Sequence, residues 1–134
     1  MTRILQISDT HIVPYGQLAY GQVDTAQALA DCVETINQSM PEIGPIDMVI
    51  IAGDLTDFGT EEEYLRFRTI MEPLDIPYRA VPGNHDDVAV MRACFWDQAW
   101  MPNEGPINWA VDFGDLALIG LDSSVTDCAH GHIV

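Results

Sequence analysis

The sequence predicts an α/β protein with a mainly parallel sheet, flanking helices and a C-terminal β-hairpin. Short apolar runs alternate with segments whose apolar residues recur at helical spacing, and turn-forming residues separate them. Successive parallel strands need a crossover, and helices of this length provide it with the usual right-handed connection. The chain shows neither an internal repeat nor a linker, so we expect a single domain over residues 1–134.

Two strands and a helix are predicted in the first half of the chain. Residues 3–8 and residues 48–52 are short apolar runs bounded by turn signals, as buried strands are. Between them, Asp24 is placed to cap a helix that extends to about residue 39. Three residues are expected to end that helix: Pro41, Gly44 and Pro45.

The second half predicts two more helices, a third strand and the hairpin. One helix begins where Thr60 and Glu63 form a capping box, and it stops before Pro73. Residues 78–81 form the third strand, and Asp87 caps the third helix. That helix ends near residue 96, and the hairpin strands cover residues 108–112 and 116–121 around a turn at 113–115.

The charge of the chain excludes some functions and favours cation binding. The formal net charge is −16, lysine is absent, and five arginines are the only strongly basic side chains. Such a protein repels polyphosphate backbones, so we expect no nucleic-acid polymer as a partner. A bound phosphate group would therefore need metal ions to neutralise it.

Cysteine usage and hydropathy favour a cytoplasmic location. The three cysteines, Cys32, Cys94 and Cys128, are widely spaced and form no C-x-x-C pair, as expected of reduced thiols. The N-terminal residues lack a signal-peptide pattern, and no apolar run approaches the roughly 20 residues of a membrane span. We therefore expect a cytoplasmic protein with no membrane partner.

Three polar blocks directly follow the three predicted strands. They are Asp9-Thr10-His11, Gly53-Asp54-Leu55-Thr56-Asp57 and Gly83-Asn84-His85-Asp86. The carboxyl ends of parallel strands lie along one edge of a sheet, and folds of this kind bind ligands there. We therefore expect these blocks, although far apart in the sequence, to converge on a single site.

The side chains in these blocks suit a transition-metal site. Asp9 and His11 stand at positions i and i+2, so an extended backbone directs both to the same face. Together with Asp54 and Asn84 they offer two carboxylates, one imidazole and one amide oxygen. This mixed set favours Mn, Fe, Zn or Co over calcium or a thiolate zinc site.

The three blocks resemble the calcineurin-like metallophosphoesterase family, whose pattern is D-x-H, then G-D-x-x-D, then G-N-H-D/E. The strings SDTHI, YGQVD, GDLTDFG and VPGNHDD are most similar to the branch of class III cyclic-nucleotide phosphodiesterases and glycerophosphodiesterases. The resemblance extends from residue 1 to about Ser124. It implies that the chain forms the N-terminal half of the family's αββα sandwich.

The resemblance also implies how the metal ligands are shared between two ions. Asp9 and His11 would bind the first metal, Asp54 would bridge both metals, and Asn84 would bind the second. The implied cofactors are two divalent ions, Mn, Fe, Zn or Co, with no organic cofactor.

The same resemblance assigns catalytic roles and a reaction. His85 would lie beside the phosphate, and Asp57 would pair with His85 and orient its imidazole. Asp86 would serve loop hydrogen bonding. The implied reaction is hydrolysis of a small phosphodiester, of the cyclic-nucleotide or glycerophosphodiester type, by a metal-bound hydroxide.

The chain departs from the family pattern near its end. The lone histidine and the G-H-x-H motif that follow in the family are absent, and the tail from His130 to His132 does not match them in order or context. We therefore expect a C-terminally incomplete domain that is weakly active or inactive in isolation. Neither tail histidine is expected to bind metal, and an exposed sheet face would permit homo-oligomerisation.

Some alternatives remain open at this point. The function could instead be that of a phosphomonoesterase of the same family, or of a catalytically incomplete fragment that binds metal or a partner. The loop containing Tyr15 and Tyr20 could form a wall of the substrate pocket. The three tryptophans could line that pocket too, although core or interface packing is the simpler interpretation: Trp96, Trp100 and Trp109.

Overall fold

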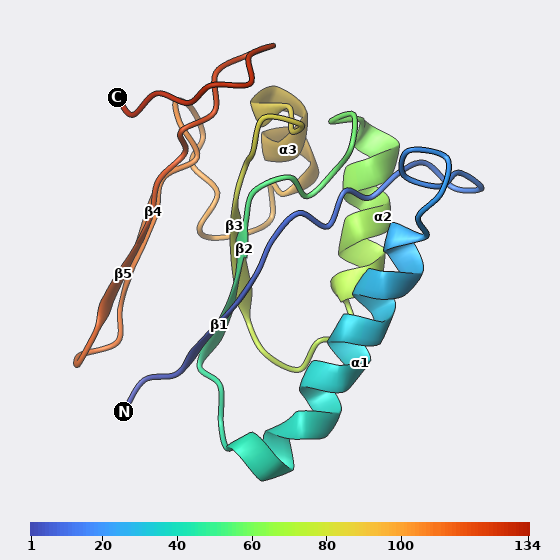
Figure 1. Ribbon diagram of the computed structural model, residues 1–134. Helices are drawn as coiled ribbons and strands as arrows, with labels where there is room; N and C mark the ends of the chain where they lie inside the picture. The colour runs from blue at the N-terminus through green and yellow to red at the C-terminus, as the bar shows by residue number, and fades with distance from the viewer.

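Three parallel strands in the order β1-β2-β3 form the central sheet of the computed structural model, which describes residues 1–134 (Figure 1). The strands are β1 (Ile4–Ile7), β2 (Met48–Ala52) and β3 (Tyr78–Val81). Parallel pairing joins β1 to β2 and β2 to β3. The predicted α/β class and its parallel sheet are confirmed.

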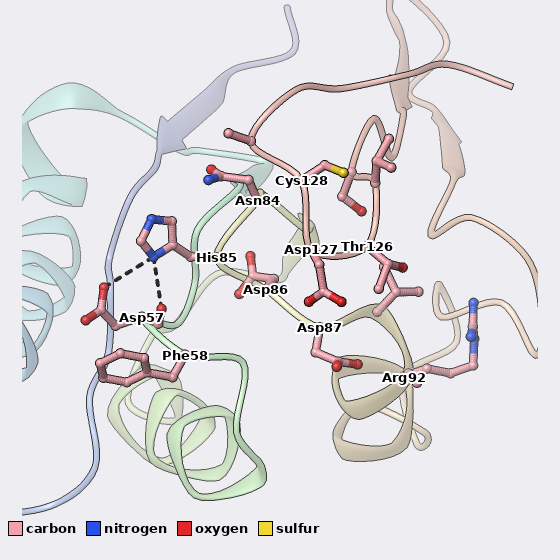
Figure 2. A pocket seen from close by; sticks show the side chains of 15 residues that line it. Asp57, Phe58, Asn84, His85, Asp86, Asp87, Arg92, Thr126, Asp127 and Cys128 are labelled. Atoms are coloured by element: carbon pink, nitrogen blue, oxygen red, sulfur yellow. Dashed lines mark hydrogen bonds and ion pairs between the residues drawn. The ribbon is translucent and has the colours of Figure 1, made fainter.

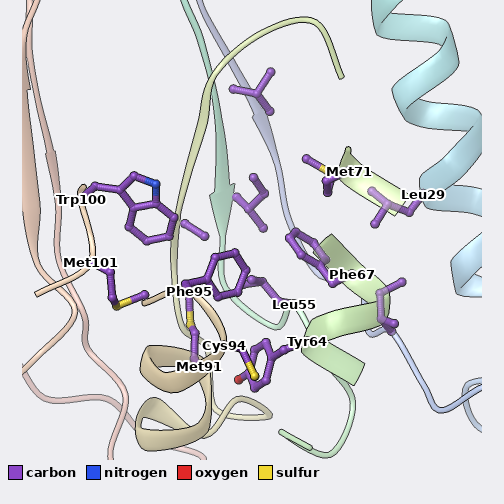
Figure 3. Packing of buried hydrophobic residues seen from close by; sticks show 14 of the residues in the cluster. Leu29, Leu55, Tyr64, Phe67, Met71, Met91, Cys94, Phe95, Trp100 and Met101 are labelled. Atoms are coloured by element: carbon purple, nitrogen blue, oxygen red, sulfur yellow. The ribbon is translucent and has the colours of Figure 1, made fainter. Parts of the chain in front are cut away.

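Two helices, α1 (Thr25–Ile43) and α2 (Glu61–Met71), lie together on one side of the sheet (Figure 1). The short helix α3 (Val88–Cys94) follows β3 near the carboxyl ends of the strands. Aromatic and aliphatic side chains from the sheet and helices pack in a single core, with Tyr64, Phe67 and Phe95 fully buried within it (Figure 3). No helix combines the length and the apolar character that crossing a membrane would require.

Helix α1 continues past the predicted end near residue 39. Pro41 lies inside its last turn, and the helix ends only at Gly44, whose φ of 83° no other residue type adopts as readily. A proline so near the end removes a single main-chain hydrogen bond, and Gly44 closes the turn by donating its N–H to Met40. Pro41 therefore does not stop the helix, and the predicted end was wrong.

The start of α2 confirms the capping box. The Thr60 hydroxyl accepts a hydrogen bond from the Glu63 N–H at 3.3 Å, and the Glu63 carboxylate accepts from the Thr60 N–H at 2.9 Å. The same carboxylate also accepts from the Phe58 N–H, so Glu63 is fully buried without being unpaired. This carboxylate therefore holds the loop that leads from the second polar block into α2.

The predicted hairpin is present as β4 (Trp109–Asp112) and β5 (Ala117–Gly120), paired antiparallel beside the sheet (Figure 1). The Trp109 indole N–H donates to the Ala80 carbonyl at 2.9 Å and so ties the hairpin to β3. The Trp109 ring lies against Gly120 so closely that any side chain there would clash with it. Trp109 is thus a packing residue, which confirms the simpler interpretation for that tryptophan.

The structure also shows where α3 ends, how far the other two tryptophans are buried and that the cysteines are unpaired. Helix α3 ends at Cys94 rather than near residue 96, because Phe95, with φ −110° and ψ 22°, leaves helical geometry. Trp100 is buried in the core, whereas Trp96 is 80% exposed. All three cysteines are free thiols, and the one that ends α3 is buried.

Candidate metal centre

The first two polar blocks are joined main chain to main chain beyond the ends of their strands. The Asp9 N–H donates to the Gly53 carbonyl, and the His11 N–H donates to the Asp54 carbonyl, each at 3.0 Å. These bonds continue the pairing of β1 with β2 into the loops. They are the physical reason why Asp9, His11 and Asp54 meet at the carboxyl edge of the sheet.

Three of the predicted metal ligands have a strained backbone. Asp9, His11 and Asp54 have φ values of 57°, 41° and 49°, and they are three of the only five non-glycine residues with positive φ in the chain. Such conformations cost of order 1–3 kcal/mol each and persist at functional sites where the surroundings enforce them. The prediction of an extended backbone at Asp9 and His11 was wrong, because both residues adopt the left-handed conformation.

His11 lies between acidic side chains on both sides of its ring. Its Nε2 lies 3.5 Å from Asp54 Oδ2 and 3.7 Å from Asp9 Oδ1, and its Nδ1 lies 3.1 Å from Asp57 Oδ1. Ligand atoms of Asp9, His11 and Asp54 all fall within 4.8 Å of one another, so these three residues could hold a metal ion. A carboxylate on the opposite ring nitrogen is the usual way in which proteins orient a ligating histidine.

His85 is held mainly through the main chain of Asp57. Its Nδ1 lies 2.9 Å from the Asp57 carbonyl oxygen and 3.4 Å from the Asp57 carboxylate (Figure 2). The buried Asp57 carboxylate is closer to His11 than to His85, so it serves two imidazoles, where the resemblance implied a pair with His85 alone. The hydrogen bond to the Asp57 carbonyl raises the pKa of His85, and the nearby carboxylates add to this effect.

The third block is fitted tightly against Asp54. The His85 N–H donates to Asp54 Oδ1 at 3.0 Å. A Cβ atom on Gly83 would lie 2.5 Å from the Asp54 main-chain nitrogen and closer still to its Oδ1. Only glycine therefore fits at position 83, and the fit fixes both the Asp54 carboxylate and the exposed Asn84 that follows.

Asp86 fastens the second and third blocks together. Its carboxylate accepts hydrogen bonds from the N–H groups of Gly83, Leu55 and Thr56 at 2.8 to 3.1 Å, and from the Thr56 and Tyr64 hydroxyls. Burial raises the pKa of Asp86, although these hydrogen bonds act in the opposite direction. The expectation that Asp86 serves loop hydrogen bonding is confirmed.

Asn84 lines two cavities. A hollow of about 740 Å³ is lined by Asn84, His85 and Arg92 and by residues 124–129 (Figure 2). A smaller cavity of about 260 Å³ is lined by Asn84 together with Asp9, Asp54 and His130. The sequence did not predict that residues beyond 122 would border the site, because no motif or apolar spacing marks them.

The tyrosine loop borders the site through one of its two tyrosines. Tyr20 lines a third cavity with Asp57, Phe58 and His85, and its ring lies 6.2 Å from the His11 ring. Tyr15 instead lies under the Arg66 guanidinium, 4.5 Å from it.

This arrangement of acidic and imidazole ligands on the carboxyl edge of a parallel sheet defines a metal-binding α/β protein, and comparison with known proteins identifies its family. A sequence profile described as "Calcineurin-like phosphoesterase" matches residues 2–134. The chain therefore belongs to the calcineurin-like phosphoesterase family.

The relatives found by sequence comparison are named as phosphodiesterases. The chain is 38% identical to the "Probable glycerophosphodiester phosphodiesterase GpdQ" of Arcobacter nitrofigilis, over 96% of this chain and 46% of the relative. It is 36% identical to a cAMP/cGMP dual specificity phosphodiesterase of Mycobacterium tuberculosis, over 97% of this chain and 41% of the relative. The chain thus spans less than half the length of these curated relatives. The branch that the sequence motifs indicated is confirmed.

A solved structure shares the fold. Purple acid phosphatase PPD1 from yellow lupin superposes with a TM-score of 0.58, at 18% sequence identity, over 88% of this chain and 23% of the phosphatase. At that identity the likeness concerns the fold alone, and it confirms the predicted metallophosphoesterase architecture.

Proposed function

We propose that the protein containing these residues hydrolyses small phosphodiesters at a two-metal centre. The observation that carries the proposal is the convergence of Asp9, His11 and Asp54, whose ligand atoms lie within 4.8 Å of one another. We assign Asp9 and His11 to the first ion, Asp54 to a bridging position and Asn84 to the second ion. The mixed oxygen and nitrogen donor set fits Mn, Fe, Zn or Co.

Divalent ions bound there would supply positive charge for the phosphoryl oxygens and lower the pKa of an attacking water. The protein itself contributes by holding the ligand side chains in place. The Asp54 carboxylate is held by the His85 N–H, and the His11 ring is held by Asp57, so neither ligand must reorganise when an ion binds. Because the backbone strain at these positions is already present, the ligand geometry is set before metal or substrate arrives.

His85 is the general acid in this proposal. Its Nδ1 faces the Asp57 carbonyl, which leaves Nε2 to contact the substrate, and its raised pKa favours the protonated ring. A protonated imidazole beside the phosphoryl group can stabilise its charge and donate a proton to the leaving oxygen. Asp57 acts as the positioning residue for this ring.

The substrate class follows from the relatives and from charge. The relatives are named for glycerophosphodiester and cyclic-nucleotide hydrolysis, and both substrates are small. A cavity of about 740 Å³ beside His85 has room for either type of leaving group. The acidic chain, at a formal charge of −16, disfavours extended polyanions as substrates.

The test is Mn(II)-dependent hydrolysis of bis(p-nitrophenyl) phosphate by the longest expressed form of the protein. We expect Asp54→Asn to abolish turnover, and His85→Ala to lower it by about 10²–10⁴-fold, the usual contribution of a general acid. Asp75→Asn, which changes an exposed carboxylate remote from the site, should leave turnover unchanged. Metal-dependent turnover that survives Asp54→Asn would refute the assignment.

The rival function is metal binding without hydrolysis. It is favoured by one observation: Asp9, His11 and Asp54 form one group of three possible ligands, which by itself would hold a single ion. Tight Mn(II) binding with no turnover of either bis(p-nitrophenyl) phosphate or p-nitrophenyl phosphate would support the rival. Faster turnover of p-nitrophenyl phosphate would instead favour a phosphomonoesterase.

A further inference from the structure

Residues 122–132 follow β5 at the end of the molecule where α3 lies (Figure 1), and part of this segment lines a cavity with Asp9 and Asp54; we call it the 122–132 loop. Its start is fixed by Asp122, whose buried carboxylate accepts hydrogen bonds from the Ile107 N–H and the Ser124 N–H, both at 2.9 Å. The Ser124 hydroxyl donates to the same carboxylate at 2.6 Å. The loop is therefore anchored to the protein where it leaves β5.

The loop also closes on itself. The His132 N–H donates to the Ser123 carbonyl at 2.8 Å, so the two ends of the loop are joined. Gly131 packs on Ser123 so tightly that a Cβ atom there would lie 2.9 Å from the Ser123 carbonyl oxygen. This closure determines where the preceding residue, His130, is placed.

His130 borders the cavity that contains the proposed metal ligands. Asp9, Asp54 and Asn84 line the cavity of about 260 Å³, and His130 lines it with Ser123 and Ser124 from the loop. The larger cavity, which Asn84 also lines, is lined by His85. Two imidazoles therefore border the site, His85 from the third block and His130 from the 122–132 loop.

The chemistry of this cavity favours a phosphoryl contact over a metal contact for His130. Two groups of side chains have ligand atoms within 4.8 Å of one another, Asp9-His11-Asp54 and His11-Asp57-His85, and His130 belongs to neither, so it is not among the residues placed to share an ion. A larger group that fills the cavity would touch both walls. No lysine or arginine lines this cavity, so His130 is its one imidazole donor for phosphoryl oxygens.

We propose that His130 donates a hydrogen bond to the phosphoryl group of the bound substrate, from the wall of the cavity that also contains Asp9 and Asp54. The inference rests on the proposed function, because the phosphoryl group is held there by the metal ions. It extends the site beyond the three polar blocks and gives the 122–132 loop a role in substrate binding.

The experiment titrates inorganic phosphate into the Mn(II)-loaded protein by calorimetry, with Mn(II) affinity measured separately by electron paramagnetic resonance. His130→Ala is the test variant, and His132→Ala, two residues along the same loop, is the matched control. We expect His130→Ala to weaken phosphate binding about tenfold or more, the value of a hydrogen bond to a charged group, with Mn(II) affinity unchanged. His132→Ala should bind both as tightly as the unaltered protein.

Two results would overturn the inference while the proposed function stands. One is equal phosphate affinity in His130→Ala and His132→Ala; the other is weaker Mn(II) binding in His130→Ala, which would make His130 a metal ligand. If the unaltered protein binds no Mn(II), or binds Mn(II) but no phosphate, the inference fails together with the proposed function.

Discussion

A single missing side chain positions the Asp54 carboxylate. Gly83 leaves the space into which Asp54 fits, and its φ is not positive, so a substitution there acts by steric conflict alone. We expect Gly83→Ala to push Asp54 aside and to weaken Mn(II) binding at least tenfold. Gly114→Ala is the control, because it adds backbone strain at an open position in the hairpin turn. Equal Mn(II) affinity in the two variants, measured by titration with electron paramagnetic resonance detection, would contradict this packing argument.

Asp86 is the residue on which the loop arrangement most depends. An amide at position 86 would turn a donor toward N–H groups that need an acceptor, so Asp86→Asn should lower the free energy of unfolding by about 2 kcal/mol. Urea denaturation measures this change, and Asp75→Asn, at an exposed carboxylate, should stay within about 0.5 kcal/mol. A stable Asp86→Asn variant would show that the hydrogen bonds to this carboxylate contribute little.

At the residue scale, the sequence identified the chemistry of the site but not its geometry. Asp9, His11 and Asp54 were recognisable because their residue types follow predicted strands. Their positive φ values and the sharing of Asp57 between two imidazoles depend on contacts between loops that are far apart in sequence. No local pattern encodes such contacts.

At the scale of elements, the start of α2 was predictable and the end of α1 was not. The capping box is a local pattern, because its hydrogen bonds join residues three positions apart. The end of α1 was decided by Gly44 against the weaker signal of Pro41, and proline near a helix end costs only one bond. Strong helix signals can therefore override a proline in the last turn.

The capping box can be tested by paired substitutions at its first residue. Thr60→Ala removes the side-chain acceptor for the Glu63 N–H and should lower the free energy of unfolding by about 1 kcal/mol. Thr60→Ser keeps the hydroxyl and should retain most of that stability. Urea denaturation of both variants measures the difference, and equal loss in the two would mean that the methyl group rather than the cap matters.

At the scale of the whole molecule, charge opposes folding. Twenty-one acidic residues against five arginines repel one another most when the chain is compact. Raising NaCl from about 10 mM to about 0.1 M shortens the screening length from about 30 Å to about 10 Å, so the thermal midpoint should rise by several degrees. Calorimetry in the presence of EDTA measures this without bound metal. A midpoint that stays constant or falls would contradict the repulsion argument.

The parallel sheet followed from the order of apolar runs, whereas the 122–132 loop did not. Apolar runs with helices between them indicate parallel strands joined by right-handed crossovers, and parallel pairing alone places the three polar blocks at one edge, but the order β1-β2-β3 came from the structure. The loop has no apolar periodicity, and its path is set by hydrogen bonds to Asp122 and Ser123. Its position beside the metal ligands could only be learned from the structure.

In the proposed function, three distant blocks form one metal centre with Asp54 at its middle. The most direct test is a Mn(II) titration of Asp54→Asn beside the unaltered protein and Asp75→Asn, followed by electron paramagnetic resonance. Because Asp54 bridges both ions in this account, its substitution should abolish tight binding of both together, while Asp75→Asn binds Mn(II) as the unaltered protein does. Retention of two tightly bound ions in Asp54→Asn would contradict the account.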